Sequence, residues 1–198
     1  MNFKVKDHYY KKAKKENFMA RSVYKLEEID QKYHLIGSKD VVLDLGYYPG
    51  SWTQYVLSRK NFSGKVVGVD IQDVNHKLAA HDRVNLFCQS IDDINSLEDL
   101  GVKEKFDCVI SDMAPKTTGI KSVDQLRSLG LVEMVFHKLE MFLALDGNFV
   151  IKVFDSNDAQ MFLKAQKDKF EEFKFFKPKS TRKISKEFFV IGKGFLGI

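Results

Sequence analysis

The chain has 198 residues, a net charge of +5 and an isoelectric point of about 9.0. This length is sufficient for one domain with a buried core, and no apolar run approaches the roughly 20 residues of a membrane-spanning helix. The amino-terminal segment also lacks the apolar stretch of a secretory signal. We therefore expect a single cytoplasmic domain over residues 1–198, with no membrane association.

The two cysteines, Cys88 and Cys108, lie inside apolar segments. They are expected to be buried free thiols in a reducing compartment rather than partners in a disulfide. The histidines are scattered, and no His/Cys spacing is typical of zinc. The sequence therefore predicts no metal site.

Residues 1–18 form a basic arm that also carries aromatic side chains, and a second basic region lies near the carboxyl terminus. Basic groups bind phosphates and aromatic rings stack on bases, so both regions are predicted to bind RNA. The alternative is that both are solvated surface segments. The predicted RNA contacts are Lys11, Lys12, Lys14, Lys15, Arg21, Arg182 and Lys183.

After the arm, the spacing of Val23, Leu26 and Ile29 predicts a helix over residues 19–33, closed by Gly37. Strand and helix patterns then alternate. Strands are expected at residues 41–45, 65–69, 84–88, 106–110 and 148–154, with helices at 52–60, 97–100, 122–145 and 159–170. Two late strands, 173–176 and 187–191, have only a basic loop between them. This order predicts an α/β fold: a mostly parallel seven-stranded sheet with an antiparallel edge strand and helices on both faces.

The loop after the first strand is rich in glycine and begins at Gly46. Gly46 and Gly50 allow tight turns and close approach of the backbone to a ligand. The dinucleotide fingerprint G-x-G-x-x-G is absent, which argues against a nicotinamide-dependent oxidoreductase. Asp44 suits a cationic ligand, and Asp70 is placed to accept hydrogen bonds from ribose hydroxyls. A nucleoside with a cationic tail predicts S-adenosylmethionine; the alternative is an ordinary turn in which the two acids cap helices.

Four charged residues far apart in the sequence are candidates for catalysis: Lys25, Asp112, Lys152 and Glu187. Asp112 and Lys152 end or interrupt strongly apolar strand patterns, where charges are rare unless they pair or do chemistry. Converging on one pocket, the four would suit deprotonation of a weakly acidic hydroxyl. The alternatives are a snorkelling Lys152, a surface Lys25, a helix-capping Asp112 and a solvated Glu187.

Four motifs together resemble the FtsJ/RrmJ ribosomal RNA methyltransferases. They are A-R-S-x-Y-K-L (residues 20–26), D-L-G-x-x-P-G-x-W-x-Q (44–54), S-D-M-A-P (111–115) and I-K-V-F (151–154). The resemblance extends from about residue 7 to the last strand. It implies the Rossmann-like fold of S-adenosylmethionine-dependent methyltransferases and transfer of a methyl group to a ribose 2′-hydroxyl.

The resemblance also implies site residues. Lys25, Asp112, Lys152 and Glu187 would form a catalytic tetrad, and cofactor contacts would come from Gly50, Trp52, Asp70 and Asp112. The family aspartate that holds the adenine amino group aligns with Ile91, and the neighbouring Asp92 is the candidate after a shift of one residue. Tyr47 and Tyr48 stand where the family usually has small residues, and would reshape the methionine end of the pocket or stack on RNA.

The side chains also predict the chemistry. Burial and a nearby cation both favour a neutral lysine amine, so Lys152 is the predicted base. The S-D-M-A-P sequence differs from the Asn/Asp-Pro-Pro-aromatic sequence of nucleobase amino methyltransferases, which favours a hydroxyl acceptor. We expect a monomer that methylates a ribose, predicted to be a uridine, in large-subunit ribosomal RNA within the ribosomal particle. Transfer RNA remains an alternative substrate, and a non-catalytic RNA-binding or ribosome-assembly protein remains an alternative function.

Overall fold

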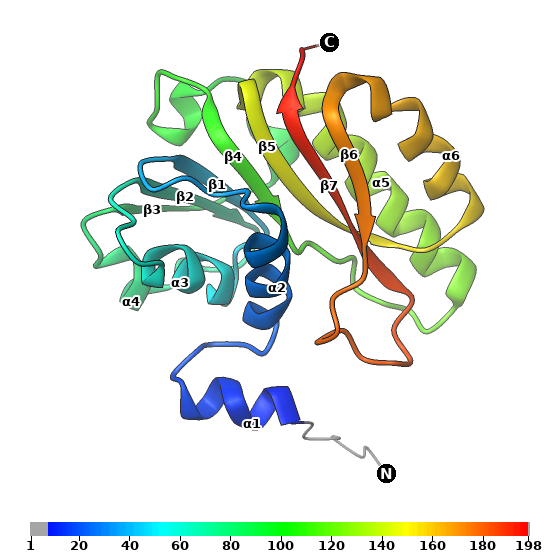
Figure 1. Ribbon diagram of the computed structural model, residues 1–198, viewed down its shortest axis with the longest axis horizontal. Coiled ribbons are helices and arrows are strands. Elements are labelled where there is room, and N and C mark those ends of the chain that lie inside the picture. Colours follow the sequence, from blue (N-terminus) through cyan, green and yellow to red (C-terminus); the bar gives the residue numbers. More distant parts are fainter. Residues whose placement is uncertain (1–7, 198) are drawn as a thin grey trace.

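The computed structural model describes residues 8–197 and is organised around one seven-stranded sheet (Figure 1). The strand order is β3-β2-β1-β4-β5-β7-β6. The strands are β1 (Val41–Leu45), β2 (Lys65–Asp70), β3 (Val84–Cys88), β4 (Phe106–Ser111), β5 (Leu143–Phe154), β6 (Phe170–Phe176) and β7 (Glu187–Phe195). Strands β1 to β5 are parallel, whereas β7 is antiparallel to both β5 and β6. The predicted α/β fold is confirmed. The hairpin of β6 and β7 is placed so that β7 lies between β5 and β6, and β6 forms the edge of the sheet.

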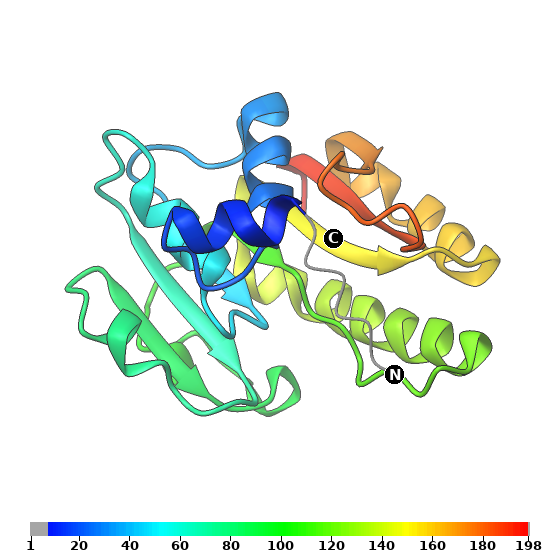
Figure 2. The same ribbon diagram turned by 90° about the horizontal axis from the view of Figure 1, so that it is seen from below.

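Helices cover both faces of this sheet, as predicted. They are α1 (His8–Lys15), α2 (Val23–Tyr33), α3 (Ser51–Ser58), α4 (His76–Ala79), α5 (Lys121–Phe142) and α6 (Asn157–Ala165), with short 3₁₀ helices η1 (Ile91–Asp93), η2 (Glu98–Leu100) and η3 (Lys167–Lys169). One apolar core joins α5 and α6 to the sheet, and a second joins α1, α2 and α3 to the opposite face. Figure 2 shows α2 and α5 on opposite sides of β5.

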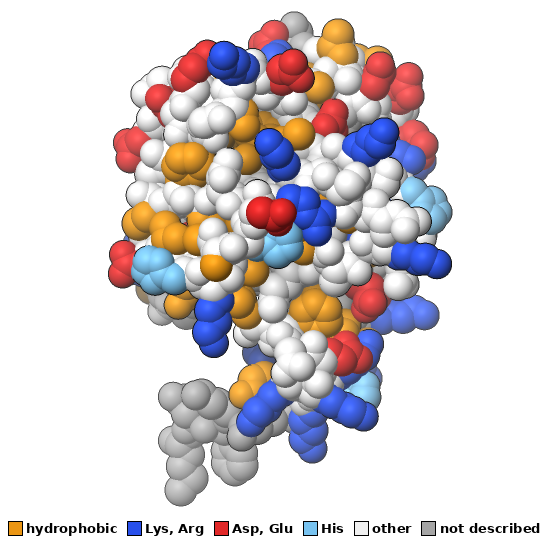
Figure 3. All heavy atoms as spheres, turned by 90° about the vertical axis from the view of Figure 1, so that its left-hand side faces the viewer, with side chains coloured by type: hydrophobic (Ala, Val, Ile, Leu, Met, Phe, Trp, Pro, Cys, Tyr) orange, Lys and Arg blue, Asp and Glu red, His pale blue; other side chains and the backbone are white. Residues whose placement is uncertain are grey.

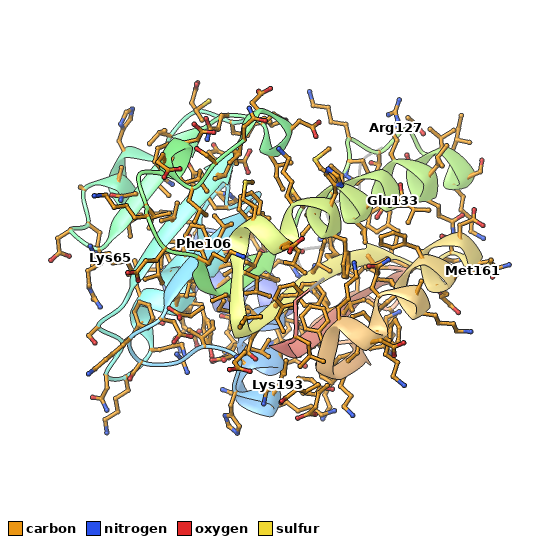
Figure 4. The ribbon with its side chains drawn as sticks, turned by 90° about the horizontal axis from the view of Figure 1, so that it is seen from above. Lys65, Phe106, Arg127, Glu133, Met161 and Lys193 are labelled. Atoms are coloured by element: carbon orange, nitrogen blue, oxygen red, sulfur yellow. The ribbon has the colours of Figure 1, made fainter. Side chains whose placement is uncertain are left out.

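The outer faces of helices α5 and α6 carry exposed side chains. Arg127 and Glu133 point away from the sheet on α5, and Met161 does so on α6 (Figure 4). No helix in residues 8–197 is both long and apolar enough to span a membrane.

Two predicted helix ends were wrong because the residues beyond them pair with neighbouring strands of the sheet instead. The helix predicted over residues 122–145 ends at Phe142, since Leu143 is buried and pairs with Phe106 at the start of β5. The helix predicted over 159–170 ends at Ala165, and Phe170 instead begins β6 and stacks on Phe149 with ring centroids 4.9 Å apart. In both places the apolar residue is compatible with a helix or with a strand, and pairing with a neighbouring strand determines which one forms.

The first helix, predicted over residues 19–33, ends at Tyr33 as predicted but starts only at Val23. It is closed by His34 in the left-handed conformation (φ 53°) rather than by Gly37. Cys108 is buried in β4 and Cys88 is exposed, and both are free thiols. The prediction of a buried Cys88 was wrong because it ends β3, which lies at the edge of the sheet.

The described part of the basic arm forms a helix docked on α2. Ala13 of α1 is buried, and the rings of Tyr9 and Tyr24 lie 5.5 Å apart. The Tyr24 hydroxyl donates a hydrogen bond to Glu16 Oε2 (2.8 Å). Burial is the main cause that raises the pKa of Tyr24, and this hydrogen bond is the second. The Lys12 ammonium lies 4.2 Å from the centre of the Tyr24 ring. Residues 1–7 of the predicted arm lie outside the described residues.

The end of α2 is fixed to α3 through one buried carboxylate. Asp30 Oδ1 accepts hydrogen bonds from the backbone N–H groups of Leu35 (3.0 Å) and Ile36 (3.1 Å). Asp30 Oδ2 accepts one from the Tyr55 hydroxyl (2.9 Å) and lies 2.8 Å from Arg59 Nε. Because a buried carboxylate with four partners is costly to move, α2 is held rigidly beside the sheet.

Candidate active site

Four chain segments bring charged residues to one edge of the sheet. Asp112 follows β4, Lys152 lies near the carboxyl end of β5, and Lys25 lies in the first turn of α2. Glu187 begins β7, which runs antiparallel to β5 and pairs Glu187 with Phe154. The first residue of β7 therefore lies at the same edge as the ends of the parallel strands. Ligands of such sheets bind at this edge where the strand order reverses, here between β1 and β4.

These four side chains form a continuous chain of ion pairs. Asp112 Oδ1 lies 2.9 Å from Lys152 Nζ and 3.8 Å from Lys25 Nζ. Glu187 Oε1 lies 2.6 Å from Lys25 Nζ. The Lys152 amine also donates a hydrogen bond to the Asp112 backbone carbonyl. The structure thus brings together the residues that the sequence selected, and the snorkelling alternative for Lys152 does not apply because its side chain is only 8% exposed.

The ion-pair chain is balanced, with two ammonium and two carboxylate groups, and no more than 19% of any of the four side chains is exposed. In such a setting removal of one partner leaves an uncompensated charge, which is strongly unfavourable. At the end formed by Lys25 and Glu187, the ion-pair chain lines a cavity of about 450 Å³. The arrangement can hold a small hydroxyl-bearing group against amines that accept or donate a proton.

The loop after β1 has the glycines that its conformation requires. Gly46 has φ +73° and Gly50 has φ +116°, a region that favours glycine. A Cβ at Gly46 would lie 2.3 Å from Met113 Cγ, and one at Gly50 would lie 2.0 Å from Leu78 Cδ1. Both positions are therefore explained by the tight packing of the loop, whether or not a ligand is present.

The two unusual tyrosines in this loop point in different directions. Tyr47 is buried, its ring lies against Gly68 of β2, and its hydroxyl accepts a hydrogen bond from the Asn75 N–H (3.2 Å). Tyr48 is 50% exposed, and its backbone N–H donates to Asp70 Oδ2 (3.0 Å). Tyr47 thus belongs to the local packing, while the Tyr48 ring is accessible to a ligand or to RNA.

The predicted cofactor residues fall into an exposed and a buried group. Asp70 is half-buried at the end of β2, and its carboxylate has spare acceptor sites beyond its bonds from Tyr48 and Gln72. Asp92 is exposed in η1, whereas Ile91 is buried in the core, so only Asp92 can present a polar side chain to a ligand. These two carboxylates are accessible to a ligand along the ends of β2 and β3.

Trp52 and Asp44 are in the buried group. The Trp52 indole N–H donates to the Ser22 carbonyl (2.9 Å), and its ring packs 5.9 Å from that of Phe189. Asp44 is 1% exposed and accepts a hydrogen bond from the Thr53 hydroxyl (2.7 Å). Both side chains fix the start of α3, so a ligand contact at Trp52 would use its backbone N–H in the first turn of that helix, where N–H groups favour anions.

The buried Asp44 makes stability depend on pH. Burial is the main cause that raises the Asp44 pKa from 3.8 to about 7, and the Thr53 hydrogen bond offsets this only partly. Between these values the folded-state Asp44 carboxyl binds more protons than it does in the unfolded chain, so the contribution of Asp44 to stability falls as pH rises from 4 to 7. The full shift corresponds to about 4 kcal/mol.

Asp44→Asn is therefore expected to be more stable than the wild type at pH 8 and to show a flatter dependence of stability on pH. Asparagine retains an oxygen that accepts the Thr53 hydrogen bond. Urea denaturation between pH 4 and pH 8 measures both effects. An unchanged pH dependence in the variant would show that Asp44 is ionised in the folded protein throughout this range.

The predicted RNA contacts lie in two places. Arg21 and Arg182 line the cavity beside Lys25, while Lys183 is exposed next to it. Lys11, Lys14 and Lys15 are exposed on the outer side of α1 with Tyr10, and Figure 3 shows lysines and arginines gathered around this helix. Lys12 faces the other way, toward the Tyr24 ring. The sequence did not indicate which lysine of α1 would face inward, since the helix itself was not predicted.

Comparison with known proteins decides the family. The model of the FtsJ-like methyltransferases matches residues 18–195. The chain belongs to the FtsJ-like methyltransferase family. It is 47% identical over 197 residues to the ribosomal RNA large subunit methyltransferase E of Bdellovibrio bacteriovorus, covering 97% of this chain and 98% of the relative. The corresponding protein of Treponema denticola is 42% identical over 194 residues, covering 96% of each chain.

A solved structure agrees with this assignment. The crystal structure named for a ribosomal RNA methyltransferase of Plasmodium falciparum superimposes with a TM-score of 0.78 at 28% identity, covering 91% of this chain and all of that chain. The protein is thus a methyltransferase with the Rossmann-like fold that the motifs implied. Methyltransferases of such families in general use S-adenosylmethionine.

The residues at the sheet edge fit this cofactor. Asp70 and Asp92 supply acceptors for a nucleoside, the first turn of α3 supplies N–H groups for a carboxylate, and Asp112 supplies negative charge at the switch point for a sulfonium. Within residues 8–197 no group of three or more His, Cys, Asp or Glu side chains is arranged to hold a metal ion.

Proposed function

We propose that this protein transfers the methyl group of S-adenosylmethionine to the 2′-hydroxyl of a ribose in large-subunit ribosomal RNA. In this proposal the acceptor is a uridine within the ribosomal particle, and residues 1–198 act in the cytoplasm as a single-domain monomer. The observation that carries the proposal is the chain of ion pairs from Lys152 through Asp112 and Lys25 to Glu187, ending at a cavity. The names of the related proteins support the choice of RNA.

The chemistry assigns different tasks to the four residues. The bound cofactor supplies an electrophilic methyl group on a sulfonium. After its ammonium has released a proton to solvent, the neutral Lys152 amine accepts the proton that the ribose hydroxyl loses, and Asp112 orients this amine through the 2.9 Å contact. Lys25, fixed by Glu187, stabilises the developing negative charge on the ribose oxygen. Holding the hydroxyl in line with the methyl group supplies a further large part of the rate.

The remaining predicted residues complete the proposal. Asp70 and Asp92 would hold the nucleoside part of the cofactor, while Gly46, Gly50 and Trp52 would approach it through their backbone. Asp44 would hold the loop beneath the cofactor to α3 through the hydrogen bond from Thr53 rather than contact the cofactor, because its carboxylate is buried. RNA would be bound by Arg21, Arg182 and Lys183 near the cavity, and by Lys11, Lys14 and Lys15 on the outer face of α1.

A methyl-transfer assay tests the proposal. Labelled S-adenosylmethionine is supplied to large ribosomal subunits and to bulk transfer RNA from a strain that lacks this protein, and the modified nucleoside is identified after digestion. The expected result is label on a ribose of large-subunit RNA. Label only in transfer RNA would move the substrate to that class. No label in either, despite a thermal shift on adding S-adenosylmethionine, would overturn the enzymatic proposal in favour of a non-catalytic RNA-binding role.

A further inference from the structure

The short helix η1 follows β3 at the edge of the sheet where the nucleoside is proposed to bind. Its approach is tied to β2, because the Gln89 N–H donates a hydrogen bond to the Asp70 carbonyl (2.9 Å). Ile91 and Ile94 are buried in the core, whereas Asp92 between them is exposed. The segment therefore presents the Asp92 carboxylate outward while two apolar side chains hold it to the core.

A 3₁₀ helix of three residues leaves carbonyl groups that its own turn does not use. In this segment the Ser90 carbonyl accepts a hydrogen bond from the Asp93 N–H (3.1 Å), and the Ile91 carbonyl accepts one from the Ile94 N–H (3.3 Å). The Ser90 hydroxyl caps the start by accepting from the Asp92 N–H (3.3 Å). The carbonyl groups of Asp92 and Ile94 are left for a partner from outside the segment.

Lys138 of α5 supplies that partner. Its ammonium donates a hydrogen bond to the Asp92 carbonyl (2.8 Å) and another to the Ile94 carbonyl. The pKa of the nearby Asp99 carboxyl is lowered, chiefly by hydrogen bonds from two backbone N–H groups and further by the charge of Lys138. One ammonium group thus joins α5 to η1 and to the turn that follows it.

Lys138 lies at the margin of the buried face of α5. Val135 and Leu139 on the same helix are fully buried, and the Lys138 side chain beside them is partly buried. A lysine in such a place usually extends its ammonium into water. Here the ammonium instead binds two carbonyl groups, and hydrogen bonds from a charged donor are stronger than those between neutral groups. Lys138 therefore restricts the peptide groups that follow Asp92 and Ile94, and with them the direction of the Asp92 side chain.

We propose that Lys138 is a positioning residue for the adenine of S-adenosylmethionine and acts through the direction of the Asp92 carboxylate. A carboxylate only accepts hydrogen bonds, and the 6-amino group is the only N–H donor of adenine in a nucleoside. Asp92 can therefore bind adenine only through that amino group, and only if its carboxylate is aimed within hydrogen-bond range. This inference rests on the proposed function and adds to it a residue that acts on the cofactor through another.

The test titrates S-adenosylhomocysteine, and its analogue in which purine without the amino group replaces adenine, against the full chain without RNA. The wild type is expected to bind S-adenosylhomocysteine at least about tenfold more tightly than the analogue. Lys138→Met keeps an apolar, helix-forming stem and should weaken S-adenosylhomocysteine about tenfold while leaving the analogue within about twofold. The matched control is Lys164→Met, which removes the same charge from an exposed position of α6 and should change neither affinity.

A double-mutant cycle separates positioning from a general effect on the fold. Asp92→Ala should weaken S-adenosylhomocysteine about tenfold. Adding Lys138→Met to Asp92→Ala should cause no more than about a twofold further loss, because the side chain that Lys138 directs is already absent. Equal affinity of the wild type for the two ligands, equal weakening of both ligands in Lys138→Met, or additive losses in the double variant would each overturn the positioning role.

Hydrogen exchange in the ligand-free protein measures the contact itself. Lys138→Met should accelerate exchange of the Asp93 and Ile94 amides at least about tenfold and leave the amides of α6 unchanged. Both amides donate within the η1 turn, so their exchange reports its opening. Unchanged exchange at these two amides would mean that η1 is held without Lys138 and would overturn the inference.

Failure of this inference and failure of the proposed function give different results. If large ribosomal subunits are methylated by the wild type, Lys138→Met should raise the KM for S-adenosylmethionine about tenfold and leave kcat within about twofold. An unchanged KM would overturn the positioning role and leave the function standing. If the wild type methylates no RNA but binds S-adenosylhomocysteine with the coupling between Lys138 and Asp92, the positioning role stands and the proposed function fails.

Discussion

Lys152→Met is expected to lower the single-turnover rate of methyl transfer to large ribosomal subunits by a factor of about 10²–10⁴, the usual contribution of a general base. Methionine has nearly the length of lysine, fits an apolar strand and cannot accept a proton. The Lys152 side chain is 8% exposed, and its amine has two partners, the carboxylate and the carbonyl of Asp112. Lys25 contacts two carboxylates, so Lys152 is the amine with fewer ionic partners to give up when substrate enters.

Lys174→Met provides the matched control for this measurement. Lys174 lies on strand β6, about half of its side chain is exposed, and its ion pair with Glu172 is 3.9 Å long. The substitution removes the same charge from a strand, but the ion pair of Lys174 is with Glu172 and not with any of the four residues, so transfer should proceed at the wild-type rate. A thermal shift on adding S-adenosylmethionine verifies that both variants fold and bind cofactor. Transfer by Lys152→Met within fivefold of the wild-type rate would exclude Lys152 as the base.

The strand pattern was sufficient to select Asp112 and Lys152, whereas the roles of Lys25 and Glu187 were assigned through the resemblance to the FtsJ/RrmJ family. The carboxyl ends of all parallel strands lie at one edge of the sheet. A charged residue that ends a buried parallel strand is therefore expected at that edge. Asp112 and Lys152 could therefore be placed together without coordinates. Glu187 lies at this edge because β7 runs antiparallel to β5, a direction that the basic loop before it had suggested.

Residues whose partners are distant in sequence and surface-like in composition could not be selected in this way. Glu28 lies on α2 and accepts hydrogen bonds from backbone 151 and 152 residues away, yet it looks like any glutamate on a helix surface. The inward direction of Tyr47 depends on the absence of a side chain at Gly68, on another strand. The positions of Lys12 and Arg21 likewise depend on how α1 docks on α2, which no local pattern records.

Asp112→Asn is expected to be more damaging than Glu187→Gln, although each removes one carboxylate from the same ion-pair chain. Asp112 Oδ1 is shared by Lys152 and Lys25, whereas Glu187 contacts Lys25 alone. Asparagine would retain an acceptor for Lys152 but would leave two largely buried ammonium groups with one carboxylate between them. Breaking a buried pair of this kind costs about 3–5 kcal/mol, and partial exposure of Asp112 favours the lower end.

The two variants should therefore differ in both stability and rate. Urea denaturation should show a loss of about 3 kcal/mol for Asp112→Asn and a smaller loss for Glu187→Gln. Single-turnover transfer should fall at least about a hundredfold in Asp112→Asn, because the base loses its orienting charge, and about tenfold in Glu187→Gln. Equal losses of stability and rate in the two variants would mean that the four charges act as two separate ion pairs, Asp112–Lys152 and Glu187–Lys25. A larger loss in Glu187→Gln would assign the central role to Lys25, and the proton would then leave the ribose toward α2 rather than toward β5.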